Sequence, residues 1–195
     1  MDHRKKIIIY ILKFIGAFCL LYFGTLLIIG LAVPGGYYSP FVQHNLDFVT
    51  ALRNSLMYTS KWILSLFGYD CYIGGPTSLR LRGGRGINIG YDCLGYGVTS
   101  FWLAFVFANK GTFKKKLAWM VCGAIALWII NIIRLSLMLV STNNNWSFPF
   151  GFDNHTWFNI VAYGFIFLMI WLYDKSQKKH HIQSNLVAGN ATTTL

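Results

Sequence analysis

The chain has 195 residues, of which 55% are hydrophobic and only 12% are charged, and its mean hydropathy is +0.47. These proportions exclude an ordinary soluble domain, in which about a quarter of the residues are charged, and they predict an integral membrane protein. The formal net charge of +11 could suggest a nucleic-acid partner. Its distribution along the chain is that of a membrane topology signal instead, so no nucleic-acid binding is expected.

Four apolar segments are long enough, or nearly so, to cross a bilayer as helices, which takes about 20 residues each. They are residues 7–33, 91–108, 117–141 and 155–173. The first segment follows a basic start, but it is longer than the apolar region of a secretory signal and is predicted to be a retained span. Residues 1–175 are therefore expected to form one all-α membrane domain, followed by a disordered cytoplasmic tail over residues 176–195.

Basic residues gather on one side of these four spans. That side carries most of the seventeen Lys and Arg residues: Arg4, Lys5, Lys6, Lys13, Lys110, Lys114, Lys115, Lys116, Lys175, Lys178 and Lys179. Because cytoplasmic loops carry the Lys and Arg excess, both termini are predicted to lie inside. The protein is placed in the cell (inner) membrane, with residues 34–91 as an extracytoplasmic insert.

Two elements are expected in this insert. An apolar-rich helical segment over about residues 42–67 is interrupted by polar side chains, which predicts an amphipathic helix at the outer surface; the interruptions are Arg53, Asn54, Ser60 and Lys61. Alternating residues over about 78–90 predict a small β-hairpin. A three-residue loop, 83–85, would pair Leu81 with Ile87, Arg80 with Asn88, and Leu79 with Ile89. The alternative is a flexible Gly/Arg loop that touches lipid headgroups.

Arg134 lies within the apolar run of the third predicted span. A charge at that depth costs roughly 2.5–3.5 kcal/mol on insertion scales, so an intramembrane Arg marks a functional site by default. Ser141, at the outer end of this span, is seven residues further on, or about 10 Å along a helix. The guanidinium can therefore reach toward the outer face.

Two other reactive side chains are expected at the same face, Cys93 at the mouth of the second span and His155 at the mouth of the fourth. Helical spacing extends each of the three into a stripe that lipid would reject. The stripes are Cys93, Gly97, Ser100 and Ala104; Leu127, Asn131, Arg134 and Met138; and His155, Asn159, Ala162 and Tyr163. The simplest arrangement has the three stripes facing one another.

A thiol, a guanidinium and an imidazole suit acyl transfer. Cys93 would attack as a thiolate, which a nearby cation or a helix N-terminus favours and Asp92 opposes. His155 would take and return the proton, and Arg134 would stabilise the thiolate, the oxyanion or the substrate.

At these residues the chain resembles the exosortase/archaeosortase family of transmembrane enzymes. The resemblance rests on Cys93-Leu94-Gly95, on Asn131-Ile132-Ile133-Arg134 and on His155, in that order, and it covers about residues 73–173. It implies a membrane-embedded cysteine peptidase or transpeptidase that cleaves C-terminal sorting signals of secreted proteins and passes the new C-terminus to a lipid or glycan acceptor through a thioester. The catalytic roles it implies fall on Cys93, Arg134 and His155. From their positions in the sequence, the residues expected to bind substrate or to support the site are Asn131, Asn159, Asp92, Gly95 and Arg82.

The chain departs from the family at Leu94, where members commonly have Ser, and in having few spans. The rival interpretation is a non-catalytic membrane partner that binds anionic headgroups and contains a structural Cys71–Cys93 disulfide. Its candidate cations are Arg80, Arg82, Arg85 and Arg134. Asp92 or Asp153 would then pair with Arg134. No cofactor and no metal site are expected.

Overall fold

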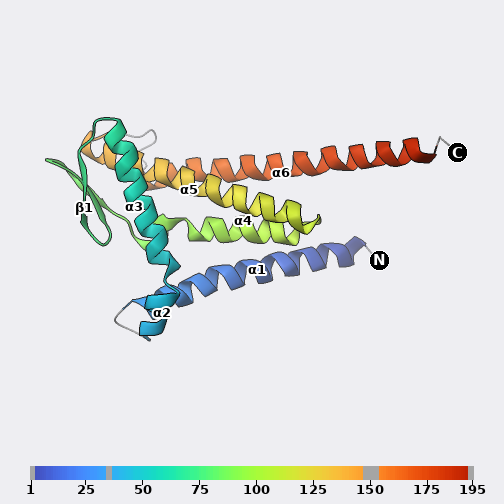
Figure 1. The fold of residues 1–195 in the computed structure, drawn as a ribbon, viewed down its shortest axis with the longest axis horizontal. Coiled ribbons are helices and arrows are strands. Elements are labelled where there is room, and N and C mark those ends of the chain that lie inside the picture. Colours follow the sequence, from blue (N-terminus) through green and yellow to red (C-terminus); the bar gives the residue numbers. More distant parts are fainter. Residues whose placement is uncertain (1–2, 34–36, 147–153, 193–195) are drawn as a thin grey trace. The chain divides into compact units, whose positions relative to one another are not determined.

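The computed structural model describes residues 3–33, 37–146 and 154–192, with side chains for 4–33, 37–146, 156–157 and 159–177. Its elements in chain order are α1 (His3–Ala32), α2 (Pro40–Asn45), α3 (Phe48–Leu66), β1 (Cys71–Gly75), β2 (Ser78–Leu81), β3 (Gly86–Asn88), the 3-10 turn η1 (Tyr91–Leu94), α4 (Tyr96–Ala108), α5 (Phe113–Asn143) and α6 (Asn154–Thr192) (Figure 1). By their contacts, residues 1–158 form one compact unit and residues 159–195 a second.

Helices α1 and α4 pack antiparallel through aromatic rings. Phe14 meets Phe101 edge to face at 5.4 Å between ring centroids, and Tyr22 stacks on Tyr96 at 5.5 Å. Residue numbers that increase along α1 therefore meet residue numbers that decrease along α4. The start of α1 therefore lies beside the end of α4, and both the end of α1 and the start of α4 lie at the opposite end.

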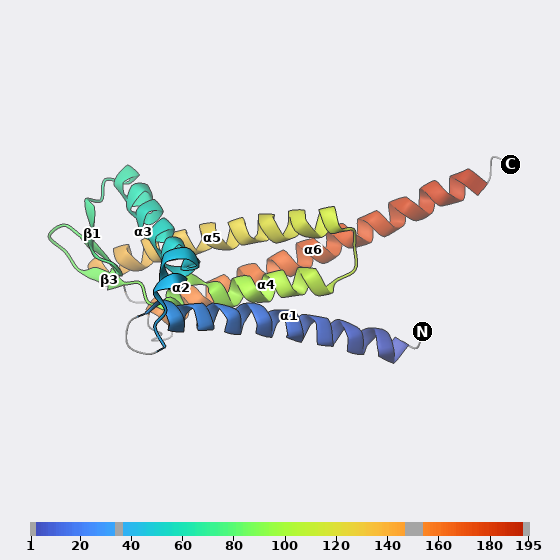
Figure 2. The same cartoon turned by 60° about the horizontal axis from the view of Figure 1, so that its bottom comes forward.

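Helices α4 and α5 form an antiparallel hairpin, joined by a short connection (Figure 2). The indole Nε1 of Trp102 donates to the backbone oxygen of Trp119 at 3.1 Å. Gly123 lies against the same indole so closely that no Cβ would fit there. A bulky aromatic ring against a glycine lets the two helices approach closely at this point.

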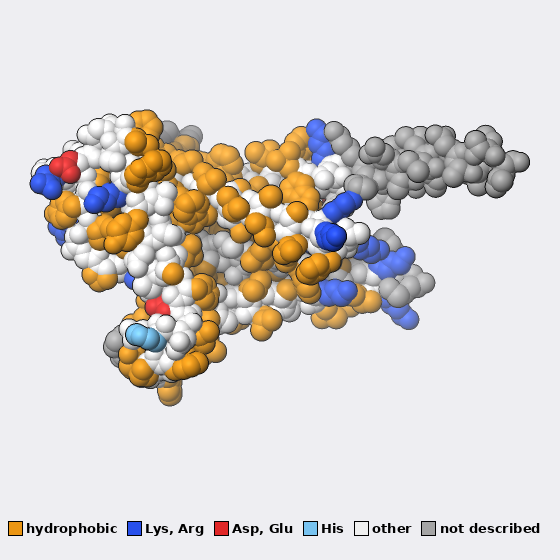
Figure 3. Space-filling model, viewed as in Figure 1, with side chains coloured by type: hydrophobic (Ala, Val, Ile, Leu, Met, Phe, Trp, Pro, Cys, Tyr) orange, Lys and Arg blue, Asp and Glu red, His pale blue; other side chains and the backbone are white. Residues whose placement is uncertain are grey.

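These two packing contacts bring two groups of basic residues to the same end of the helices, those at the start of α1 and those around the α4–α5 connection. The start of α1 and the α4–α5 connection lie at one end of the three helices, and Lys and Arg side chains gather there, while the helix sides are largely apolar (Figure 3). The β-sheet, α3 and the end of α5 lie at the other end (Figures 1 and 2).

The amphipathic helix expected over residues 42–67 is two helices, α2 and α3. The break falls at Leu46 and Asp47, where the Asp47 side chain accepts a hydrogen bond from the Thr50 amide at 2.9 Å and so caps the start of α3. An Asp in this position satisfies one of the unpaired N–H groups of a new helix. Helix α3 runs across the ends of the long helices instead of along them (Figures 1 and 2).

The predicted hairpin is present, but its register is wrong by two residues and a third strand precedes it. The sheet has the order β1-β2-β3, both pairs antiparallel, and Leu79 faces Ile87 where Ile89 was expected. The turn is closed one residue earlier than predicted, by hydrogen bonds from the Leu81 amide to the Arg85 oxygen and from the Gly84 amide to the Leu81 oxygen, with Gly83 at a φ of 76°. A shift of two keeps each side chain on its face, so Leu79 and Ile87 are still both buried.

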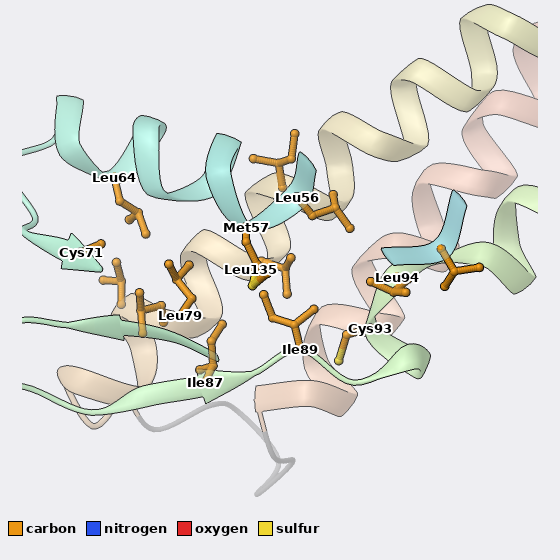
Figure 4. Packing of buried hydrophobic residues seen from close by; sticks show 14 residues of the cluster. Leu56, Met57, Leu64, Cys71, Leu79, Ile87, Ile89, Cys93, Leu94 and Leu135 are labelled. Carbon is orange, nitrogen blue, oxygen red and sulfur yellow. The ribbon is translucent and has the colours of Figure 1, made fainter. Parts of the chain in front are cut away.

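The buried face of the sheet, α3 and the C-terminal half of α5 share one apolar cluster (Figure 4). Strand residues Leu79, Ile87 and Ile89 pack against Leu56 and Met57 of α3. The cluster also includes the turn η1 and the α5 residues Ile132, Leu135 and Leu139.

Among the described residues, two helices are long and apolar enough to cross a membrane, Arg4–Ala32 and Phe113–Asn143. They correspond to the first and third predicted spans. The second predicted span is a shorter helix, α4, of 13 residues preceded by η1, because Gly95 ends the turn in a left-handed conformation. The fourth lies in α6, which continues through the predicted tail to Thr192. The number of crossings, their orientation and the division at residue 175 stay predictions.

Candidate active site

Cys93 lies in the turn η1, directly before α4, and its side chain is buried in the apolar cluster. Gly95 follows with φ 72° and ψ 16°. This left-handed conformation is open to glycine and costly for residues with a Cβ. A Cβ at Gly95 would also lie 3.2 Å from the Asn131 side-chain nitrogen. The backbone conformation therefore favours glycine after the Cys93 turn, and a Cβ there would also displace the Asn131 side chain by a few tenths of an ångström.

Asn131 joins this turn to α5. Its side-chain Nδ2 donates to the backbone oxygen of Cys93 at 3.0 Å, and both residues are buried. A buried amide that is hydrogen-bonded fixes geometry, because losing the bond leaves a polar group unpaired in the core. Asn131 is therefore in direct contact with the backbone of the Cys93 turn, and its role in binding or support stays a prediction.

Arg134 lies on the same face of α5 as Asn131, one turn closer to the C-terminal end of the helix. Only 8% of its surface is exposed, and its Nε and Nη2 atoms are buried with no hydrogen-bond partner in the described part of the chain. The expected pairing with Asp92 is absent, since Asp92 is exposed and forms no ion pair with it. Asp153 lies outside the described residues. Arg134 thus presents unsatisfied donors in the layer of α5 that holds the Cys93 turn.

Cys71 and Cys93 are both free thiols and lie toward opposite ends of the apolar cluster, with strand residues between them (Figure 4). The structural disulfide of the rival interpretation is therefore wrong for this structure. Burial raises the pKa of the Cys71 thiol, Asp70 raises it further, and Lys61 partly opposes the rise. Because the thiolate is the nucleophile, Cys71 is held in its unreactive form.

The other predicted residues are distributed more widely. Arg82 pairs with Asp70 at 2.9 Å on the exposed side of the sheet. Asn159 is half-buried in α6. His155 belongs to the first turn of α6, and its side chain lies outside the described residues. Arg82 thus lies apart from the Cys93 turn, on the exposed side of the sheet.

One residue of this region was not predicted to take part. Arg53 of α3 is 6% exposed, and its guanidinium carbon lies 4.5 Å from the centroid of the Tyr91 ring, at the start of η1. In the sequence, Arg53 is one of several polar residues in a segment that predicts an amphipathic helix, and nothing there separates it from the side chains that face water.

Two helices long and apolar enough to cross a membrane, with a thiol and a guanidinium buried between the packed elements, are the features of an integral membrane protein. The chain belongs to the transmembrane exosortase family, because the model of that family, described as transmembrane exosortase (EpsH), matches residues 7–172. The resemblance seen over residues 73–173 is thus confirmed over a longer range, and membership points in general to a membrane transpeptidase. No curated protein matches the chain, and no solved structure matches it.

Proposed function

We propose that the protein is a membrane-embedded cysteine transpeptidase that cleaves C-terminal sorting signals of secreted proteins. The observation that carries the proposal is one face of α5, where Asn131 binds the backbone of the Cys93 turn and Arg134, one turn away, keeps two buried donors unpaired. An apolar core tolerates such donors poorly. A substrate carbonyl or the oxyanion formed from it would satisfy them.

In the proposed reaction the Cys93 thiolate attacks the scissile carbonyl carbon. Arg134 stabilises the oxyanion, which is charge that develops only in the transition state. The C–N bond then breaks, and His155 returns the thiol proton to the leaving amine. A thioester remains on Cys93 until an acceptor nucleophile, a lipid or glycan group, attacks it and releases the thiolate.

The depth of the residues supports a site near the outer face. If Lys116 marks the inner boundary of the hydrocarbon, Asn131 lies about 22 Å above it and Arg134 about 27 Å above it, in a core about 30 Å thick. Helix α4 alone spans about 20 Å and places Cys93 at the height of Asn131. The reacting groups would then meet the substrate just where its signal enters the bilayer.

The substrate expected for such a site has a short motif before a hydrophobic helix and a basic end. The helix would lie in the bilayer beside the enzyme, and the basic end would remain inside. Both features anchor the scissile bond at the outer face.

The test is to co-express a secreted protein that carries such a signal and to measure, by mass spectrometry, whether the signal is removed from it. Cys93→Ser and Arg134→Gln are expected to abolish processing, whereas Cys71→Ser keeps it. Hydroxylamine sensitivity of a trapped adduct on Cys93 would identify the thioester. Equal loss in Cys71→Ser and Cys93→Ser, with both proteins folded, would contradict the assignment of the nucleophile.

A further inference from the structure

Arg53 is the one charged residue on the buried face of α3. Its neighbours on that face are Val49, Leu56, Met57, Ser60 and Leu64, all of them buried. Its Nε atom is buried without a hydrogen-bond partner in the described part of the chain. A Leu or Met here would pack without desolvating a charge, so packing alone does not account for the guanidinium.

The contact that Arg53 makes is with Tyr91. A cation 4.5 Å from a ring centroid lies within the range of cation–π attraction. The planar guanidinium suits this contact better than an ammonium group. Tyr91 is the first residue of η1, and Cys93 is two residues further on.

Helix α3 is itself fixed against α5 at the same level. The Trp128 indole donates to the Ser55 hydroxyl at 3.1 Å, and Ser55 is two residues after Arg53. Trp128 lies one turn before Asn131 on α5, which holds the other end of the turn through the Cys93 carbonyl. The turn is therefore held at its start by α3 and at its end by α5.

We propose that Arg53 is a positioning residue, which fixes the Cys93 turn by stacking on Tyr91. The inference rests on the proposed role of Cys93 as the nucleophile. A fixed turn aims the sulfur at the carbonyl, so its loss lowers kcat and leaves KM little changed.

A double-mutant cycle in the full chain tests this contact. Arg53→Met and Tyr91→Leu are each expected to lower kcat for processing about tenfold, a typical loss for a desolvated cation–π pair, and the double variant is expected to lose no more than either single one. Tyr91→Phe keeps the ring and keeps the activity, and Arg53→Lys recovers part of it. The proposal would be overturned if the loss of kcat in the double variant equalled the product of the two single losses, or if Arg53→Met processed the substrate at the wild-type rate.

The matched controls are Lys61→Met and Tyr58→Leu, which change exposed side chains of the same helix and are expected to process normally. Melting temperatures in detergent identify variants that lose activity only through unfolding. The conservative pair, Tyr91→Phe and Arg53→Lys, keeps the test decisive if either larger change prevents folding.

A second readout does not need the substrate. In a chain with Cys19→Ala, Cys71→Ser and Cys122→Ala, only Cys93 reacts with methyl methanethiosulfonate. Arg53→Met and Tyr91→Leu are expected to speed its modification by equal factors, because a loosened turn exposes the buried thiol, and the double variant adds nothing. Unchanged rates in folded variants would overturn the role of Arg53. Processing that persists in Cys93→Ser would instead refute the proposed function, so the two failures differ.

Discussion

At the scale of single residues, two features favour glycine at position 95, namely its left-handed backbone conformation and the close approach of the Asn131 side chain. Gly90, on the other side of the same turn, has an ordinary φ of −70° and open space around its Cα. The two glycines flank Cys93 almost symmetrically. They therefore form a matched pair for substitution, because an added Cβ would strain the backbone at Gly95 and would be accommodated at Gly90.

Gly95→Ala is expected to lower the free energy of unfolding by about 1–2 kcal/mol, the cost of a left-handed residue with a Cβ, and to displace Asn131 from the Cys93 carbonyl. Processing should fall further than stability, because the turn carries the nucleophile. Gly90→Ala should leave both unchanged. Thermal unfolding in detergent and the reporter assay measure the two effects, and equal losses at the two positions would contradict this account.

From the sequence, Arg134 is conspicuous as a charge in an apolar run, Asn131 shares its stripe by helical spacing, and Cys93 lies at the mouth of another predicted span. The contact between Asn131 and the Cys93 backbone agrees with the expectation that these stripes face each other, whereas the catalytic roles stay predictions. Arg53 was not predicted because its segment contains several polar residues. Only the packing of α3 shows that Arg53 and Ser60 are buried, whereas Asn54 and Lys61 are not. The unpaired state of Arg134 was equally beyond the sequence, which offered Asp92 as a partner.

At the scale of elements, α5 is longer than a membrane requires. Its 31 residues extend about 46 Å, against a hydrocarbon core of about 30 Å. The excess lies at the sheet end, where the Asn143 side chain accepts from the Arg85 amide at 2.6 Å and donates to the Arg85 carbonyl at 3.2 Å. The same helix thus carries the proposed site and fastens the β2–β3 loop.

This long-range bond explains why the register of the hairpin could not be predicted. Alternation of side chains determines faces but does not distinguish registers that differ by two residues. The choice is made by the Gly83 turn and by Asn143, which is 58 positions from Arg85. Strand β1 was missed because Cys71–Gly75 has two glycines in five residues, a composition that is weak for a strand.

Asn143→Ala is expected to free the β2–β3 loop, because it removes both hydrogen bonds to Arg85. The loss should be about 1 kcal/mol, since water replaces the bonds at this exposed site. Trypsin should cut after Arg82 or Arg85 faster than in the parent chain. Asn144→Ala changes the adjacent, exposed side chain and is expected to show parent rates. A cleavage rate that rises equally in both variants would refute the role of Asn143.

At the scale of the whole chain, the packing of α1 against α4 bears on the topology. Because these helices are antiparallel, the segment between them leaves and returns at the same end. A single crossing by α3 would require the segment to begin and end at opposite ends. The antiparallel pair therefore supports an insert that stays on one side of the membrane, with α3 along the surface.

Cysteine labelling in intact cells separates the two topologies. In a chain without its four native cysteines, Tyr37→Cys, Tyr72→Cys and Lys114→Cys each introduce one thiol at an exposed position: before α3, after α3 and in the first turn of α5. If α3 stays outside, a membrane-impermeant maleimide labels the first two variants, and the third only after lysis. If α3 crosses, Tyr72→Cys becomes protected and Lys114→Cys is labelled. We expect the first pattern, because the second would place the basic end of α1 and the basic α4–α5 connection on opposite sides of the membrane, although the packing of α1, α4 and α5 holds them at one end.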